Sequence, residues 1–293
     1  MSDSVAKPPI YFSALELENV RCFGQRQTLS LTDADEDPVR WTIILGDNGV
    51  GKTTLLQCLA WMRPLQKVND KGKTIAFAPA LNNEENRILD ALIRDGSHVN
   101  ATIKATFSVG KNLGPVNKSR TKMRITTEFG MQGSDGELTE IRLKGTVPKI
   151  FRDVLPSALT IFGYGATRRS GTLKLERGGL TDPLASRFDT EIELYDAEDV
   201  LLKLDHRARV SAASKDEDRL YRIKEILATV LPDIDNPEDI SVAGPVVFDD
   251  PTEGNGVRFT TQYGSVPLSA LSLGYQTTLT WITDLALRLG EDL

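Results

Sequence analysis

The sequence predicts an α/β fold with a mixed central sheet that carries a phosphate-binding loop, an antiparallel β lobe beside it and a helical insertion. Three observations predict this fold: alternating apolar segments near the amino terminus, a glycine-rich loop before a helix, and a Ser-Leu-Gly turn before a second apolar helix. With 293 residues, 40% hydrophobic and 26% charged, the chain can bury a sizeable core in one large or two smaller domains.

Composition excludes several classes of protein. The net charge of -6 and the pI near 5.2 argue against a surface that is basic all over, although a local basic groove for nucleic acid remains open. Cys22 and Cys58 are too few for a zinc site or a disulfide framework, so we expect reduced thiols and a cytoplasmic location. The absence of a signal core and of a long apolar stretch predicts no membrane association. His98 and His206 lie far apart and indicate no metal or catalytic site.

The first ordered segments are predicted to be strands. Residues 11–20 and 25–31 alternate apolar and polar side chains around a short turn, which is typical of a half-exposed antiparallel pair. Residues 41–45, "WTIIL", form a short continuous apolar run, which predicts a strand buried on both faces of a central sheet.

The stretch "GDNGVGKTT", residues 46–54, matches the G-x-x-x-x-G-K-[ST] pattern of a P-loop. Glycines let backbone amides wrap a phosphate chain, Lys52 reaches the β and γ phosphates, and Thr53 offers a hydroxyl to Mg²⁺. The helix that begins here points its positive end at the anion and ends before Pro64. The predicted ATP-binding residues of this loop are Gly46, Asp47, Asn48, Gly49, Val50, Gly51, Lys52, Thr53 and Thr54. A chance glycine turn is the alternative, and the order strand, loop, helix favours the P-loop.

A second motif, "LSLGYQ" at residues 271–276, resembles the LSGGQ-type signature of ABC-class ATPases. The resemblance implies that Ser272 and Gly274, with Gln276 beside them, contact a γ-phosphate held by a partner subunit. Leu273 stands where the signature has a glycine, and Tyr275 is an insertion. The alternative is that Ser272 merely caps the apolar helix that follows. That helix has a predicted core face of Leu279, Ile282, Leu285 and Leu289.

Roughly 220 residues separate Lys52 from the signature, and this insertion has an organisation of its own. Residues 101–109, 120–129 and 137–145 predict successive antiparallel strands. Two helices are predicted further on, over residues 196–209 and 216–232, and Leu220, Ile223, Leu227 and Val230 share one face of the second.

The predicted domain organisation has four parts. They are a P-loop half at 1–64, an antiparallel lobe and return strand at 65–170, a helical and β insertion at 171–267, and the signature with its helix at 268–293. The expected flexible links are 110–119 and 168–183.

Taken together, "LELENVRCFGQRQTLSL", "IILGDNGVGKTTLLQCLA" and "LSLGYQTTLTWITDLALR" resemble the ATPase head of the RecF/SMC/OLD group within the ABC class. The resemblance implies that the fold is that of a P-loop NTPase of ABC type. The resemblance implies an ATPase whose heads dimerise around ATP, with Lys52 and Ser272 as catalytic residues and Ser272 and Gly274 acting in trans. It also implies that Arg21 lines the α-phosphate or the base; a solvated turn residue is the alternative.

Two further stretches have looser parallels in such heads. Residues 162–171 fall where the glutamine-bearing Q-loop lies, but no glutamine is present, so Arg168 or Arg169 either faces phosphate or belongs to a solvated loop. Residues 245–250, "PVVFDD", mimic a Walker B strand in the wrong order, so Asp249 and Asp250 are read chiefly as the exit into a turn.

The leading hypothesis is an ATP-binding and ATP-hydrolysing switch. Residues 161–171 and 195–205 resemble bacterial phage-defence ATPases of the Septu type, which implies a homo-oligomer that controls a nuclease effector. The alternatives are a RecF-like DNA-repair ATPase, which would bind nucleic acid, and a nucleotide-gated scaffold with little turnover. Because only "GEDL" follows the signature helix, we expect part of a longer protein, or a half completed by a second polypeptide, with slow turnover when alone.

Overall fold

The computed structural model divides the chain into two compact units, unit 1 at Met1–Ile161 and unit 2 at Phe162–Leu293. It describes residues 9–68, 74–83, 89, 91–96, 99–109, 122–132, 137–144, 159–165, 173–175, 182–184, 188, 192–210, 214–243 and 256–289.

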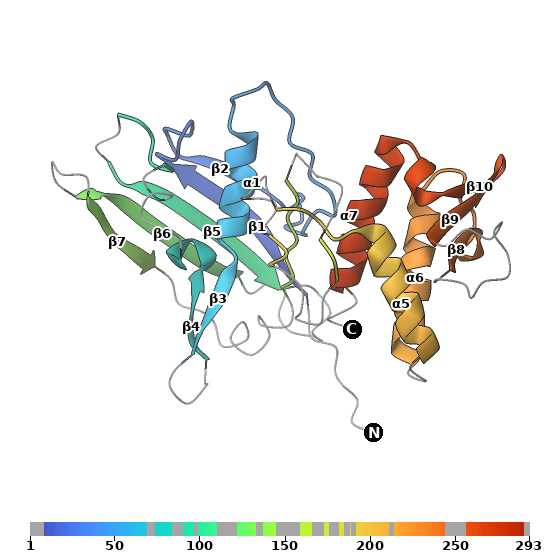
Figure 1. Ribbon diagram of the computed structural model, residues 1–293. Helices are drawn as coiled ribbons and strands as arrows, with labels where there is room; N and C mark the ends of the chain where they lie inside the picture. Colours follow the sequence, from blue (N-terminus) through green and yellow to red (C-terminus); the bar gives the residue numbers. More distant parts are fainter. Residues whose placement is uncertain are drawn as a thin grey trace. The chain divides into compact units, whose positions relative to one another are not determined.

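Unit 1 is built on a five-stranded antiparallel sheet with the order β2-β1-β5-β6-β7 (Figure 1). Its strands are β1 (Ile10–Glu18), β2 (Gln27–Ser30), β5 (Ala101–Val109), β6 (Lys122–Gln132) and β7 (Glu137–Lys144). These are the strands that alternation predicts, so both the amino-terminal pair and the antiparallel lobe are confirmed, and they belong to one sheet.

The two faces of this sheet differ because side chains alternate along each strand. In β1, Leu15 and Leu17 are buried, whereas Glu16 lies on the other face and pairs with Lys104 of β5 at 2.5 Å. Helix α1 (Lys52–Trp61) contributes Cys58 and Trp61 to the core on the apolar face. The sheet therefore holds the helix that begins at the glycine-rich loop.

After α1 the chain forms a two-stranded antiparallel sheet that no sequence pattern predicted. Its strands are β3 (Pro64–Val68) and β4 (Thr74–Pro79), and a 3₁₀ turn, η1 (Ala80–Asn83), follows. Helix α1 ends before Pro64, as expected, because proline has no N–H for the helix ladder.

The prediction of a buried strand at residues 41–45 is wrong. These residues have no strand conformation, and Trp41, Ile43 and Leu45 are 90%, 80% and 87% exposed. A central strand needs a neighbouring strand on each side, and no described strand pairs with residues 41–45. The apolar run gives these residues a propensity for strand conformation, but a strand forms only where a neighbouring strand is present to pair with it.

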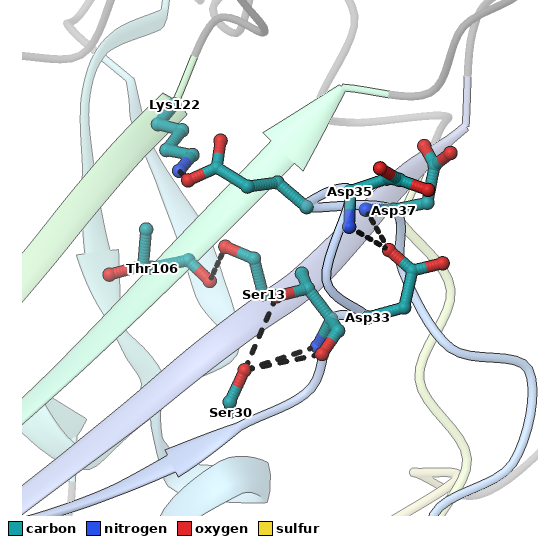
Figure 2. A network of polar contacts seen from close by, with 9 residues as sticks. Ser13, Ser30, Asp33, Asp35, Asp37, Thr106 and Lys122 are labelled. Carbon is teal, nitrogen blue, oxygen red and sulfur yellow. Dashed lines mark hydrogen bonds and ion pairs between the residues drawn. The ribbon is translucent and has the colours of Figure 1, made fainter.

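The acidic loop after β2 is held by its own carboxylates (Figure 2). Asp33 Oδ1 accepts the backbone N–H groups of Asp35 and Asp37, at 3.0 and 2.8 Å. Glu36 in the same loop pairs with Lys122 of β6 at 2.9 Å. The acidic residues thus shape a turn and attach it to the polar face of the sheet.

Unit 2 packs three helices with a small antiparallel sheet of order β10-β9-β8. Its elements are α5 (Ala197–Val210), α6 (Ser214–Val230), η2 (Pro237–Asp239), β8 (Ile240–Ala243), β9 (Gly256–Thr261), β10 (Gly264–Pro267), η3 (Leu268–Ala270) and α7 (Leu273–Leu289). Both helices of the predicted insertion are confirmed as α5 and α6, and the predicted signature helix is α7.

Two residues that were predicted to face the core of unit 2 are exposed, and both lie at the end of a helix. Leu220, Ile223 and Leu227 of α6 are buried as predicted, but Val230 is 47% exposed; Leu289 of α7 is 43% exposed. Each is the last residue of its helix, where the final turn extends past the core.

The middle of α7 also buries polar side chains, which the hydrophobic periodicity of the helix did not predict. Leu279 and Ile282 are buried as predicted, and the polar residues Asp284 and Arg288 are buried with them. None of the described helices is long and apolar enough to cross a membrane.

Candidate functional site

The glycine-rich loop presents backbone amides at the start of α1. Residues 46–50 are exposed, and Gly51, the N-cap of α1, has a φ of 98°. No side chain forms a capping hydrogen bond at this end of the helix. The first N–H groups of a helix lack partners within it, so they are available to an anion.

Lys52 lies folded across this loop. Its Nζ donates hydrogen bonds to the backbone carbonyls of Gly46 and Asp47, both at 2.6 Å. An ammonium group carries three donors, and here it lies at the same loop whose residues 46–50 are exposed. Amides and one lysine charge together form a cradle that fits a phosphate chain.

Position 51 requires glycine for two reasons, the left-handed backbone conformation and the lack of room for a side chain. Beyond its positive φ, a Cβ at this position would overlap Cys22 Sγ and lie 2.9 Å from ring atoms of Phe23. The turn that carries Arg21, Cys22 and Phe23 therefore packs directly beneath the loop. Gly49, with a φ of 86°, would meet nothing within 4 Å.

We expect Gly51→Ala to lower the free energy of unfolding by about 2 to 4 kcal/mol, because left-handed backbone strain adds to overpacking. Gly49→Ala, which suffers only the strain, should cost about 1 to 2 kcal/mol. Urea unfolding of both variants measures the difference. Equal losses would contradict the close packing of Cys22 and Phe23 against the loop.

Arg21 joins the turn after β1 to helix α1. It has a φ of 46°, its Nε donates to the Ala91 carbonyl at 3.1 Å, and its Nη1 donates to Gln57 Oε1 at 3.1 Å and to Thr54 Oγ1 at 3.4 Å. In the free protein Arg21 therefore forms hydrogen bonds to Ala91, Gln57 and Thr54. Its guanidinium lies on the first turns of the helix that follows the phosphate loop.

The two threonines after Lys52 differ in exposure. Thr53 is exposed at the start of α1, where its hydroxyl can serve as a Mg²⁺ ligand. Thr54 is buried and its Oγ1 accepts from Arg21, so it can offer only its backbone N–H to a phosphate. In the described part of the chain, no three His, Cys, Asp or Glu side chains gather as a metal site.

The predicted signature is an exposed helix start in unit 2. Ser272 precedes α7, Leu273 is 73% exposed, and an added Cβ on Gly274 would have no neighbour within 4 Å. The side chain of Gln276 points toward the preceding turn and not toward solvent. Its Nε2 donates to the carbonyls of Ser269 and Leu271, at 3.1 and 2.8 Å. Gln276 shapes the turn, while Ser272 and Gly274 remain open to a ligand or a partner.

Several predicted residues lie outside the described part of the chain. These are Arg168, Arg169, Asp249, Asp250 and His98. His206 is described and exposed on α5.

The sequence did not predict the polar cluster in which Asp284 and Arg288 of α7 meet Tyr164 and Tyr195. The one signal in the sequence was an aspartate and an arginine four residues apart in an otherwise apolar helix. That pattern brings the two side chains together on one face.

The two cysteines are expected to differ sharply in reactivity. Cys22 is exposed beside the loop, with its Sγ 3.6 Å from the Val50 carbonyl, whereas burial raises the pKa of Cys58 to about 12. The thiolate is the reactive form, so Cys58 stays protonated and unreactive below that pH. At pH 8, iodoacetamide should modify Cys22 alone, as peptide mass spectrometry would show. Modification of Cys58 in the folded Cys22→Ser variant would contradict the burial of α1.

Comparison with known protein families gives a match over most of the chain. A family model described as an AAA domain matches residues 14–228. No curated protein sequence matches.

Three solved structures share distant similarity. A structure from work on ATP-driven dimerization and DNA-stimulated activation of SMC ATPases has 16% identity and a TM-score of 0.29, covering 50% of this chain and 79% of that chain. RecF with ATP has 11% identity and a TM-score of 0.38, with coverage of 99% and 84%. The Smc head domain bound to the C-terminal domain of ScpA, from Pyrococcus furiosus, has 17% identity and a TM-score of 0.42, with coverage of 96% and 78%. The family assignment rests on the match over residues 14–228.

Proposed function

The chain belongs to the AAA domain family, and we propose that it is an ATP-binding and ATP-hydrolysing switch whose state is set by ATP-dependent dimerisation. The observation that carries this proposal is the position of Lys52 across an exposed glycine-rich loop at the start of α1. That arrangement is suited to a nucleotide phosphate chain.

The residues of unit 1 have separate roles in this proposal. The amides of the loop bind the β-phosphate, and Lys52 exchanges the carbonyls of Gly46 and Asp47 for phosphate oxygens. Thr53 would hold Mg²⁺, which would supply positive charge to the phosphate chain. Arg21, which donates hydrogen bonds to Gln57 and Thr54 of α1, would contact the α-phosphate or the base.

Hydrolysis in such a site is an in-line attack of water on the γ-phosphate. Little covalent chemistry is required of the protein, since positioning and charge neutralisation supply most of the rate enhancement. Lys52 provides charge that is fixed before the reaction begins.

The signature of unit 2 is proposed to complete the site of a second copy. Ser272 and Gly274 are exposed at the amino-terminal end of α7, so their backbone and hydroxyl donors can meet a γ-phosphate from outside. The neighbouring side chain of Leu273 is apolar and exposed, which suits a surface that becomes buried when two copies associate.

We further propose that the switch controls an associated nuclease in antiphage defence, on the resemblance of residues 161–171 and 195–205 to Septu-type ATPases. Direct DNA binding, as in a RecF-like role, has less support on the polar face of the unit 1 sheet. Lys104 and Lys122 on that face already pair with Glu16 and Glu36. DNA binding that weakens steeply with salt would favour the RecF-like role.

The proposed function is tested by titrating the protein with Mg-ATP while following its mass by light scattering and its phosphate release. We expect saturable binding, a shift from monomer to dimer with a slowly hydrolysed ATP analogue, and phosphate release. No binding would overturn the whole proposal. Binding and hydrolysis by a protein that remains monomeric would overturn the dimeric switch alone.

A further inference from the structure

The turn that packs beneath the P-loop has an uncommon backbone. It joins β1 to β2 through residues 19–24, and both Asn19 and Arg21 have left-handed conformations there, with φ of 54° and 46°. In a residue with a long side chain such as arginine, this conformation persists only where surrounding contacts hold it. The 19–24 turn therefore depends on the groups that fix it.

The hydrogen bonds within the turn close it only in part. Val20 and Phe23 exchange backbone hydrogen bonds at 2.9 and 2.8 Å, and the Asn19 N–H donates to the Gly24 carbonyl at 2.9 Å. None of these bonds uses the carbonyls at positions 21 and 22, which need donors from elsewhere.

Arg94 supplies those donors. Its Nη1 donates to the carbonyls of Cys22 and Arg21, at 3.0 and 3.4 Å. The Arg94 backbone N–H also donates to the Asn19 carbonyl at 2.9 Å. In the reverse direction, the Arg21 N–H donates to the Leu92 carbonyl at 2.8 Å. One side chain and a short backbone segment thus hold the 19–24 turn from outside.

The charge of Arg94 is directed at the backbone. Within the described residues, its guanidinium forms no ion pair with a carboxylate. A Cβ on Gly24 would lie 3.4 Å from Cζ and Nη1 of Arg94, so the guanidinium packs against the turn itself. Hydrogen bonds from a charged donor are roughly twice as strong as those between neutral groups. Arg94 is therefore suited to fixing the position of the turn.

The turn in its place contacts the P-loop. Cys22 Sγ lies 3.6 Å from the Val50 carbonyl, and Cys22 and the Phe23 ring occupy the space that a side chain on Gly51 would need. Arg21 belongs to the same turn and donates to helix α1. Displacement of the turn would remove the support of the loop and move Arg21.

We propose that Arg94 is a positioning residue of the ATP site, which holds the 19–24 turn in the conformation that supports the P-loop and Arg21. The inference rests on the proposed function, because it requires ATP at the loop. Arg94 acts through the carbonyls of Arg21 and Cys22. Without Arg94 the turn opens more often, and only molecules with a closed turn bind ATP at full affinity.

Arg94→Ala in the full chain tests this inference with two measurements. Hydrogen exchange of the peptide that covers residues 19–24 should become about tenfold faster, as expected for the loss of a hydrogen bond from a charged group. The dissociation constant for Mg-ATP, measured by calorimetric titration, should rise by a similar factor, because binding requires the closed turn. Exchange in the peptides of β5 and β6 should stay unchanged, since the opening is local.

Arg26→Ala is the matched control. Arg26 lies just beyond the turn, is exposed, and pairs with Glu18 at 2.9 Å. Its loss removes the same charge from unit 1 and should change neither the exchange of residues 19–24 nor the dissociation constant for Mg-ATP.

Arg94→Lys is the conservative variant. Both carbonyls accept from the single nitrogen Nη1, which an ammonium group with its three donors can replace. Both measured values should therefore return to within about threefold of those of the unaltered protein. Values equal to those of Arg94→Ala would contradict the role of the charged donor and overturn the inference.

Arg94→Gln covers the case in which Arg94→Ala fails to fold. Glutamine keeps a polar side chain at this exposed position but has neither the charge nor the length of arginine. Faster exchange in the turn and weaker binding of Mg-ATP are expected again.

The outcomes separate the inference from the proposed function. Unchanged exchange of residues 19–24 in a folded Arg94→Ala or Arg94→Gln variant would overturn the inference. Faster exchange with an unchanged dissociation constant for Mg-ATP would overturn it too, because Arg94 would then have a structural role alone. Both results would leave the P-loop assignment intact. If Mg-ATP does not bind the unaltered protein in a Lys52-dependent manner, the proposed function fails and the inference fails with it.

Discussion

Lys52→Ala is expected to lower the affinity for Mg-ATP by about 100-fold or more. The change removes a charge and two charge-assisted hydrogen bonds to phosphate, each of which contributes about 1.5 to 3 kcal/mol. In the free protein the Lys52 ammonium donates to the carbonyls of Gly46 and Asp47 in its own loop, so the fold should not depend on it. Calorimetric titration with Mg-ATP measures the affinity, and thermal unfolding should show the melting temperature of the unaltered protein.

The matched control is Lys122→Ala. Lys122 is a lysine of the same unit that pairs with Glu36 on the polar face of the sheet, and its loss should leave ATP affinity unchanged. Unchanged ATP affinity in Lys52→Ala would remove the P-loop assignment.

Ser272→Arg is expected to abolish ATP-dependent association while leaving ATP binding intact. Ser272 is exposed just before α7, and its side chain is small. An arginine at this position would place a large, charged side chain where the phosphate chain bound by a partner must approach. We expect the association constant with a slowly hydrolysed ATP analogue to fall by about 100-fold, equivalent to 2.7 kcal/mol. Light scattering over a range of protein concentrations measures it.

Thr229→Arg is the control for this effect of bulk and charge. Thr229 is exposed on α6, and its hydroxyl only donates to the Glu225 carbonyl within the helix. Identical association in Ser272→Arg and in the unaltered protein would leave Ser272 as a plain helix cap.

The features that the sequence predicted are those determined locally. Glycines with positive φ, a lysine at a helix start and two-residue alternation all act within a few neighbours, so the P-loop, α1, β1 and β5 follow from the chain itself. The exposure of Ser272 could be expected on the same basis, because a helix start between polar turns lies at the surface.

The features that the sequence did not predict depend on distant residues. Residues 41–45 are apolar enough for a buried strand, but burial requires partners that the pattern does not contain. The sequence did not single out Asp284, because its partner Tyr164 lies 120 residues away along the chain. Arg21 likewise needed Ala91 and Gln57 to define its orientation.

The exposure of residues 41–45 has a consequence for solubility. The segment is short, rich in β-branched residues and uncharged, which is the composition that favours intermolecular strand pairing and aggregation. Arg40 and Asp47 flank it with opposite charges, in the manner of gatekeeper residues. We therefore expect aggregation of the protein to begin in this segment. Ile43→Lys should suppress it by placing a charge at the centre of the exposed run.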